Sequence, residues 1–146
     1  MLLSAIIERT TGQTVHDFAA QYLFGPLGIT SWEWEQGNDN LYNTGWGLHL
    51  RPVDMLKIGQ LFLANGSWND QEIISSSWVS LATTDQGNNY GFQWWLTDQD
   101  TNYSARGWGG QFIFMVPQKK MVVVTTAGNF NGGNGFQLLE RIKNSL

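Results

Sequence analysis

The sequence predicts an α+β fold in which an antiparallel sheet is flanked by helices. Apolar residues at helical spacing dominate residues 2–82, whereas short aromatic and β-branched runs dominate residues 90–127. Helices and strands that are separated along the chain in this way are typical of α+β proteins. The 146 residues contain no internal repeat or obvious linker, so we expect residues 1–146 to be a single segment of one domain.

Two helices are expected at the start of the chain. The first has one apolar face and ends at Gly12, a residue type that commonly terminates helices. Thr14, with Asp17 three residues later, is a capping signal for a second helix, which the Gly-Pro-Leu-Gly run of residues 25–28 ends. The two apolar faces consist of Leu2, Leu3, Ile6 and Ile7, and then of Val15, Phe18, Ala19, Tyr22 and Leu23.

The middle of the chain is expected to hold a loop and two further helices. Residues 31–46 have no clean period and are interpreted as an ordered loop packed by its tryptophans. Pro52 can open a helix, Asp54 complements the dipole of its first turn, and Gly66 follows its end. A shorter helix is expected over residues 77–82, entered through three serines.

Four strands are expected after Gly87, over residues 90–96, 104–108, 111–116 and 121–127. The turn-forming residues 117–120 separate the last two, which should therefore pair antiparallel. Both of these strands are apolar throughout, a pattern typical of strands covered on both faces. Phe136, Leu139 and Ile142 indicate a final amphipathic helix that can supply one cover.

Composition excludes several classes of function. A net charge of −4 gives no basic footprint for nucleic acid or an anionic membrane surface. The absence of cysteine removes disulfides, thiolate zinc sites and a cysteine nucleophile, and two histidines, His16 and His49, are too few for a histidine-rich metal cluster. No apolar run reaches the roughly 20 residues that span a bilayer. We expect no cofactor, no metal, no nucleic acid and no membrane span, with periplasmic, extracellular and cytoplasmic locations all open.

Four blocks in a fixed order resemble one family. They are residues 2–12 (LLSAIIERTTG) followed by 26–29 (PLGI), residues 45–48 (GWGL) running into 51–59 (RPVDMLKIG), residues 90–95 (YGFQWW), and residues 107–111 (GWGGQ) followed by two strands. This order resembles the serine β-lactamase and penicillin-binding-protein-like family, which includes class C β-lactamases, D-alanyl-D-alanine carboxypeptidases, esterases and nylon-oligomer hydrolases. The resemblance implies a partial β-lactamase/transpeptidase-like fold.

The resemblance also implies chemistry that this chain does not complete. Such enzymes acylate the serine of a Ser-x-x-Lys motif, in which one helical turn places the lysine beside the hydroxyl, and a Tyr-x-Asn tyrosine helps to move the proton. Neither motif occurs in residues 1–146. In the family both motifs precede the matched region, so the chain is expected to be the C-terminal portion of a serine hydrolase domain and inactive by itself.

The resemblance makes Trp108, Gly109, Gly110 and Gln111 the candidate site residues. Trp108-Gly109-Gly110 occupies the place of the family's Lys-Thr-Gly segment, which lies on a strand edge and supplies one N–H of the oxyanion hole. Trp108 replaces the cation that binds a substrate carboxylate, which favours an esterase or amidase over a β-lactamase. The N–H of Gly110 or Gln111 is the expected oxyanion donor. The alternative is that the two glycines form only a β-bulge or a tight bend.

Other functions are weighed beside the hydrolase. Eight tryptophans on an acidic chain could build a non-catalytic carbohydrate- or partner-binding module, and a stand-alone pseudoenzyme or regulatory subunit is a third alternative. For the hydrolase, the expected partner is a small-molecule ester or amide substrate of the full-length parent. An incomplete sheet also predicts a homo-oligomer formed through an exposed strand edge.

Overall fold

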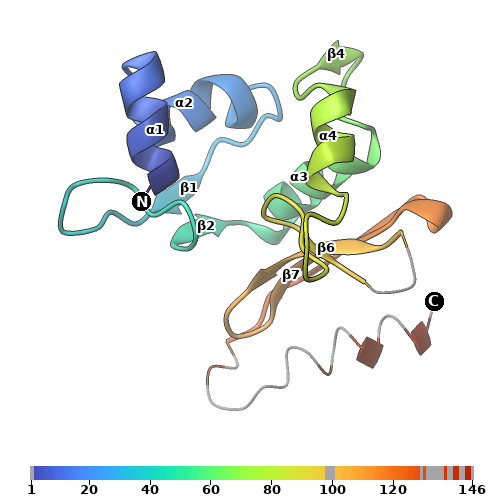
Figure 1. The fold of residues 1–146 in the computed structure, drawn as a ribbon. Helices are drawn as coiled ribbons and strands as arrows, with labels where there is room; N and C mark the ends of the chain where they lie inside the picture. Colours follow the sequence, from blue (N-terminus) through green and yellow to red (C-terminus); the bar gives the residue numbers. More distant parts are fainter. Residues whose placement is uncertain are drawn as a thin grey trace. The chain divides into compact units, whose positions relative to one another are not determined.

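Helices and antiparallel sheets make up the chain, as the α+β prediction requires (Figure 1). The computed structural model describes residues 2–97, 101–128, 130, 137, 140–141 and 144–145. The chain divides into two compact units, residues 1–54 and residues 55–146.

Two helical segments open the first unit. Helix α1 spans Leu2–Thr11 and is followed by Gly12 at φ +73°, as predicted. Helix α2 spans Val15–Ala19, and the side chain of Thr14 accepts a hydrogen bond from the backbone N–H of Asp17, which confirms the predicted cap. The second helix does not stay α-helical to its end. After Ala19 it continues as the π-helix η1, Ala20–Phe24.

The widened turn at the end of η1 has a local cause. The N–H of Gly25 donates to the carbonyl of Ala20, five residues earlier, at 2.9 Å. A Cβ at position 25 would lie 3.0 Å from that same carbonyl oxygen. Glycine therefore lets the chain close a wide turn that a larger residue would crowd.

The apolar face of α1 is mostly exposed. Leu2, Leu3 and Ile6 are exposed, Leu2 to 76%, while Ser4 is the fully buried residue of this helix. The predicted apolar face is therefore present in the sequence of α1, but it does not form the core of the first unit.

The predicted loop of residues 31–46 contains a strand, which corrects that expectation. Strand β1 (Trp32–Trp34) pairs antiparallel with β2 (Leu48–Leu50). The rings of Trp32 and Trp34 pack on the buried Phe24 with centroids 4.9 and 6.4 Å away, and Glu33 between them is exposed. Packing on Phe24 therefore stabilises an extended segment that the sequence pattern alone does not distinguish from a loop.

Two helices and a hairpin lead into the second unit. Helix α3 (Pro52–Leu63) begins at the predicted proline, and α4 (Ser76–Ala82) is capped by the side chain of Ser75, which accepts from the N–H of Trp78. Between them, β3 (Ser67–Trp68) and β4 (Gln71–Glu72) form a hairpin that was not predicted. Its two turn residues, Asn69 and Asp70, have φ of 49° and 63°, as in the tight turns that suit paired strands.

The main sheet of the second unit has four antiparallel strands in the order β5-β6-β7-β8. These are β5 (Trp95–Leu96), β6 (Tyr103–Gly107), β7 (Gln111–Val116) and β8 (Met121–Thr125). The predicted antiparallel pairing of the last two strands is confirmed, with the short helix η2 (Pro117–Lys119) between them.

The predicted strand over residues 90–96 is reduced to its last two residues, which corrects its length. Tyr90 forms only an isolated bridge with Trp95, and the N–H of Gly91 donates to the carbonyl of Trp94. The turn between them includes Gln93 at φ +67°. Aromatic content therefore indicated a strand where most of the segment is a turn.

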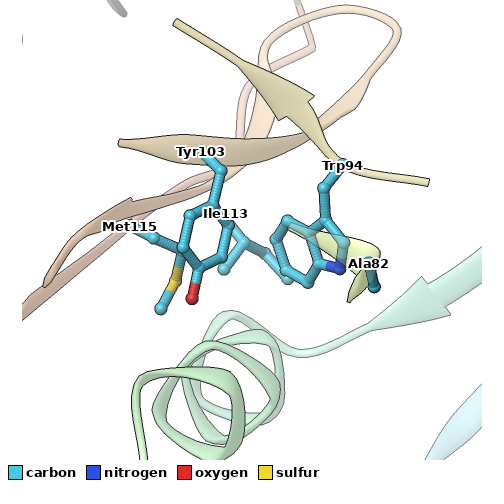
Figure 2. Close-up of a cluster of buried hydrophobic side chains, with 5 residues drawn as sticks. All are labelled: Ala82, Trp94, Tyr103, Ile113 and Met115. Carbon is cyan, nitrogen blue, oxygen red and sulfur yellow. The ribbon is translucent and has the colours of Figure 1, made fainter. Parts of the chain in front are cut away.

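The core of the second unit lies between the sheet and helices α3 and α4. Figure 2 shows Trp94, Tyr103, Ile113 and Met115 projecting to the same side, with Ala82 nearby. Partly buried residues that pack against this cluster include Met55, Ile58 and Phe62 of α3. At Gly59 the helix comes so close to the sheet that an added Cβ would lie 2.4 Å from Val122.

Strand β7 is buried on both faces, as its apolar run predicted. Ile113 and Met115 face the cluster of Figure 2, while Phe112, Phe114 and Val116 belong to a second cluster with Met121 and Val123. Strand β8 is half-buried at every position. The residues that predict a final helix, Phe136, Leu139 and Ile142, lie outside the described residues.

Candidate functional site

The predicted site residues lie together at one end of the β6–β7 hairpin. Strand β6 ends at Gly107, which pairs with Gln111, the first residue of β7. Trp108, Gly109 and Gly110 form the turn between the strands, with φ of +82° and +100° at the two glycines. The segment that corresponds to the family's Lys-Thr-Gly is therefore a tight turn. A β-bulge or tight bend was the alternative expected for these two glycines. Only Gln111 is on a strand.

The side chain of Gln111 ties this turn to the chain that follows β8. Its amide nitrogen donates to the backbone carbonyls of Trp108, at 3.1 Å, and of Ala127, and its amide oxygen accepts from the N–H of Ala127 at 3.0 Å. The hydroxyl of Thr125 donates to the carbonyl of Gly110 at 3.0 Å. Four hydrogen bonds therefore hold the turn in one arrangement.

An unpaired stretch of strand edge leads into the turn. Strand β5 pairs only with Tyr103 and Ser104, so residues 105–107 of β6 have no strand neighbour on that side within the described part of the chain. The backbone groups of a strand alternate between its two sides, so this edge presents N–H and C=O groups outward. The sequence analysis included residues 105–107 in a strand but did not identify them as part of the candidate site. The three residues between Gly107 and Gln111, two of them glycine, were the available signal, because they fit a short hairpin turn.

Two large aromatic side chains are exposed at the turn. Trp108 is 79% exposed and Phe130 is 59% exposed. The ring of Phe130 lies against Gly109, where an added Cβ would be only 2.6 Å from the nearest ring carbon. Glycine at position 109 thus allows both the left-handed backbone and the close approach of Phe130.

One half-buried cation lies on β6 before the turn. The Nε of Arg106 donates to the hydroxyl of the fully buried Ser104 at 2.9 Å, and its guanidinium lies 5.4 Å from the centre of the Trp95 ring. Burial lowers the pKa of Arg106, and the carboxylate of Glu140 partly opposes this shift. Arg106 is therefore held by neighbours of its own chain.

The first unit brings two histidines to acidic partners. His49 Nε2 lies 3.0 Å from a carboxylate oxygen of Glu35, whose N–H also donates to the carbonyl of Gly47. His16 stacks on Tyr42 and contacts Asp17, and its hydrogen bond lowers the pKa of that carboxyl group. His49 is on strand β2 and His16 is in helix α2, so each contact ties an element of the first unit to an acidic residue of the same unit.

A polar pocket of about 290 Å³ lies at the opposite end of β6 from the turn. Its lining is almost entirely polar and consists of Thr83, Asp85, Asn89, Leu96, Thr97, Thr101 and Asn102. Asp85 accepts hydrogen bonds from the backbone N–H groups of Gly87 and Tyr90, so this carboxylate shapes its own loop.

Among the residues that the structure describes, no three histidine, aspartate or glutamate side chains gather in a way that could hold a metal ion. No helix in the same part of the chain has the length and apolar character needed to cross a membrane.

Comparison with known proteins relates this geometry to one family. The model of the Beta-lactamase family matches residues 1–143. A solved structure from Bacillus anthracis that carries the name of a 6-aminohexanoate-dimer hydrolase superposes with a TM-score of 0.85 at 22% identity, covering 98% of this chain and 40% of that one. A structure from Bacteroides dorei that carries the name of a beta-lactamase gives a TM-score of 0.71 at 18% identity, covering 97% of this chain and 55% of that one.

An uncharacterized protein of Alkalihalophilus pseudofirmus is 23% identical over 181 residues, covering 97% of this chain and 54% of the relative. The chain therefore spans about half the length of the relatives it matches. Because the family model covers nearly every residue and the fold agrees, the chain belongs to the Beta-lactamase family of serine β-lactamase and penicillin-binding-protein-like hydrolases.

Proposed function

We propose that this chain is the C-terminal portion of a serine hydrolase domain that cleaves an ester or amide bond in a small molecule. Residues 1–146 would supply the substrate-side strand and part of the oxyanion hole, while the nucleophile would come from residues outside this chain. The observation that carries the proposal is the outward edge of β6 at residues 105–107, which runs directly into the glycine turn.

The edge and the turn suit two tasks in acyl transfer. An extended substrate can bind through backbone hydrogen bonds along an unpaired strand edge. At the end of that edge, the N–H of Gly110 or Gln111 would donate to the oxygen on which negative charge develops. Donors held in place before the reaction stabilise this charge without reorganisation, and the hydrogen bonds made by Gln111 and Thr125 supply that rigidity.

The absence of the two catalytic motifs from this chain supports a nucleophile that comes from other residues. No serine or threonine in residues 1–146 has a lysine three residues later, and no tyrosine has an asparagine two residues later. Tyr103 does not substitute for the proton-transferring tyrosine, because burial raises its pKa to about 12. Coverage of 40% and 55% of the matched structures is consistent with a nucleophile supplied by other residues.

The side chains at the turn favour a neutral substrate. Residues 107–118 contain no charged side chain, and Trp108 stands where a cation would bind a substrate carboxylate. Arg106, the nearest cation in sequence, is engaged by Ser104 and Trp95. This supports esterase or amidase activity over β-lactamase activity.

The test begins with the coding sequence upstream of Met1, which should encode Ser-x-x-Lys and then Tyr-x-Asn. A longer polypeptide that includes these motifs is expected to hydrolyse short p-nitrophenyl esters and to lose this activity when the motif serine is replaced by alanine. The 146-residue chain alone should hydrolyse neither these esters nor chromogenic β-lactams above background.

Two results would contradict the proposal. One is turnover by the chain alone that survives repurification and disappears when one of its own serines is replaced. The other is saturable binding of oligosaccharides by the chain alone together with an inactive longer polypeptide, which would favour the carbohydrate-binding module.

A further inference from the structure

The polar pocket of the second unit is separate from the candidate turn. The chain between α4 and β5 contributes Asp85 and Asn89 to its lining, and the chain just before β6 contributes Thr101 and Asn102. The glycine turn follows the other end of β6. A ligand in this pocket would therefore contact a different set of side chains from those at the turn.

Hydrogen bonds hold the walls of the pocket in place. The carboxylate of Asp85 accepts from two backbone N–H groups of its own loop, at 2.8 and 3.3 Å. The carbonyl of Asn89 accepts from the N–H of Leu96 at 2.8 Å, and the carbonyl of Asn102 accepts from the N–H and the hydroxyl of Thr97 at 3.2 and 3.3 Å. The pocket is therefore formed before a ligand binds, which lowers the entropic cost of binding.

The side chains of the lining determine which hydrogen-bonding groups a ligand needs. Three threonine hydroxyls and two asparagine amides can each both donate and accept, whereas the carboxylate of Asp85 can only accept. Leu96 is the single apolar residue of the lining. A matching ligand must therefore offer donors to Asp85 and both donors and acceptors elsewhere, and a ring that carries several hydroxyl groups does so.

The charge around the pocket favours a neutral ligand. Residues 73–105 contain no lysine, arginine or histidine, and their charged residues are all aspartates. An anion would meet the carboxylate of Asp85 without any cation to offset the repulsion. Asp85 is the one carboxylate among the described lining residues, whereas protein sites for Ca²⁺ usually combine several carboxylates. A neutral ligand is thus a better match than either an anion or a metal ion.

We propose that this pocket binds one ring of a neutral sugar. Its volume of about 290 Å³ is at the lower end of the range for small-molecule sites, which suits a single ring. Asp85 accepts hydrogen bonds from the hydroxyl groups of the ring, and Thr83 and Thr101 add further polar contacts. The inference goes beyond the proposed hydrolase function and does not rest on it, because the pocket and the turn lie at opposite ends of β6.

The experiment measures binding of sugars to the 146-residue chain itself by saturation-transfer difference NMR. The probes are the methyl glycosides of glucose, galactose and mannose. At least one of them should bind in a saturable way, with a Kd on the order of 1–10 mM, as expected for a small site open to solvent. Glucuronate, which adds a carboxylate to the same kind of ring, should bind at least about tenfold more weakly than methyl glucoside or not at all.

Three variants locate the bound sugar. Asp85→Asn keeps an oxygen that can accept from the loop N–H groups but removes the carboxylate, so binding should weaken about tenfold. Thr101→Val, at an exposed position of the lining, should weaken binding about threefold to tenfold because one hydroxyl is lost. Asp39→Asn is the matched control and should bind normally, because Asp39 also accepts from an N–H two residues later, that of Leu41, but does not line the pocket. Melting temperatures like that of the unmodified chain establish that the variants are folded.

Failure of all three glycosides to bind would overturn the sugar site, as would unweakened binding by both folded lining variants. Calorimetric titration with CaCl₂ covers the other ligand class. Saturable Ca²⁺ binding that is lost in Asp85→Asn, without glycoside binding, would replace the sugar with a cation and overturn the proposal. Failure of the hydrolase proposal is distinguishable, because a longer polypeptide without esterase activity would leave glycoside binding by this chain unchanged.

Discussion

The side chain of Gln111 forms with Ala127 the pair of hydrogen bonds that a residue of a neighbouring strand would form. Its amide oxygen accepts from the Ala127 N–H and its amide nitrogen donates to the Ala127 carbonyl. Regular pairing of β7 with β8 ends at Phe112 and Thr125. One side chain thus continues the ladder where the two backbones have separated.

Replacing Gln111 with methionine should therefore destabilise the chain. The change keeps the length of the side chain but removes its donor and acceptor, so we expect a loss of about 1–2 kcal/mol in the free energy of unfolding. Urea unfolding followed by circular dichroism measures it. Gln118→Met is the matched control, because Gln118 is exposed in η2. Equal stability of the two variants would show that the amide pair contributes nothing.

Burial of Tyr103 predicts a loss of stability at high pH. Burial raises the pKa of this phenol from 10.0 to about 12, so between these values the unfolded chain loses a proton that the folded chain keeps. The contribution is complete below pH 10 and is lost as pH rises toward 12, with a size on the order of 2 kcal/mol. Thermal melts from pH 9 to pH 12 test this.

Two phenylalanine variants make the pH measurement specific. Tyr103→Phe should remove most of the decline between pH 10 and pH 12, whereas Tyr22→Phe, at an exposed tyrosine, should leave the decline intact. A decline of the same depth in Tyr103→Phe would assign the pH dependence to other groups.

Gly66 should tolerate alanine far less well than Gly87 does. Both have positive φ, +87° and +123°, but a Cβ at Gly66 would lie 1.9 Å from the carbonyl oxygen of Ile74, whereas a Cβ at Gly87 meets nothing within 4 Å. We expect about 1 kcal/mol of destabilisation for Gly87→Ala, from backbone strain alone, and about 3 kcal/mol or more for Gly66→Ala. Similar melting temperatures for the two variants would contradict this.

The chain by itself is expected to associate. Strand β8 has one strand neighbour, β7, among the described residues, and Leu2, Leu3 and Ile6 expose the apolar face of α1. Open strand edges and apolar faces recruit other chains, so we predict a homodimer or higher oligomer. Light scattering over a dilution series measures the state. A monodisperse, cooperatively melting monomer at micromolar concentration would contradict the prediction and favour a self-sufficient binding module.

In a longer, active polypeptide, Gly110→Val should lower kcat more than it raises KM. A valine at φ +100° must distort the turn, so the N–H groups of residues 110 and 111 would move away from the developing charge. Loss of one such donor typically lowers kcat about a hundredfold or more. Gly12→Ala, at a position with open space, is the control for a strained glycine far from the site in sequence. An unchanged kcat in a folded Gly110→Val variant would show that the turn has no role in catalysis.

Sequence reasoning succeeded where local chemistry decides the structure. Thr14, Pro52 and Ser75 each mark a helix start because their effect acts within one turn. The β7–β8 hairpin was predictable because two apolar runs flank turn residues. Local signals of this kind need no knowledge of distant contacts.

Sequence reasoning failed where distant packing decides the structure. β1 is extended because its tryptophans pack on Phe24, several residues earlier in the chain. At the candidate site, the two glycines 109 and 110 have the same appearance in sequence whether they belong to a strand edge, a bulge or a turn. Their true setting depends on two contacts with the segment after β8, that of Gln111 with Ala127 and that of Gly109 with Phe130.

The missing side chain at Gly59 also sets the rotation of a helix about its own axis. Only a position without a Cβ can face Val122 at this distance, so α3 meets the sheet in one angular setting, with Gln60 turned to solvent and Leu61 fully buried. A slide of one residue along the sheet would bring Ile58 or Gln60 to the contact, and neither fits. The absence of a side chain at Gly59 therefore determines which face of α3 packs against the sheet.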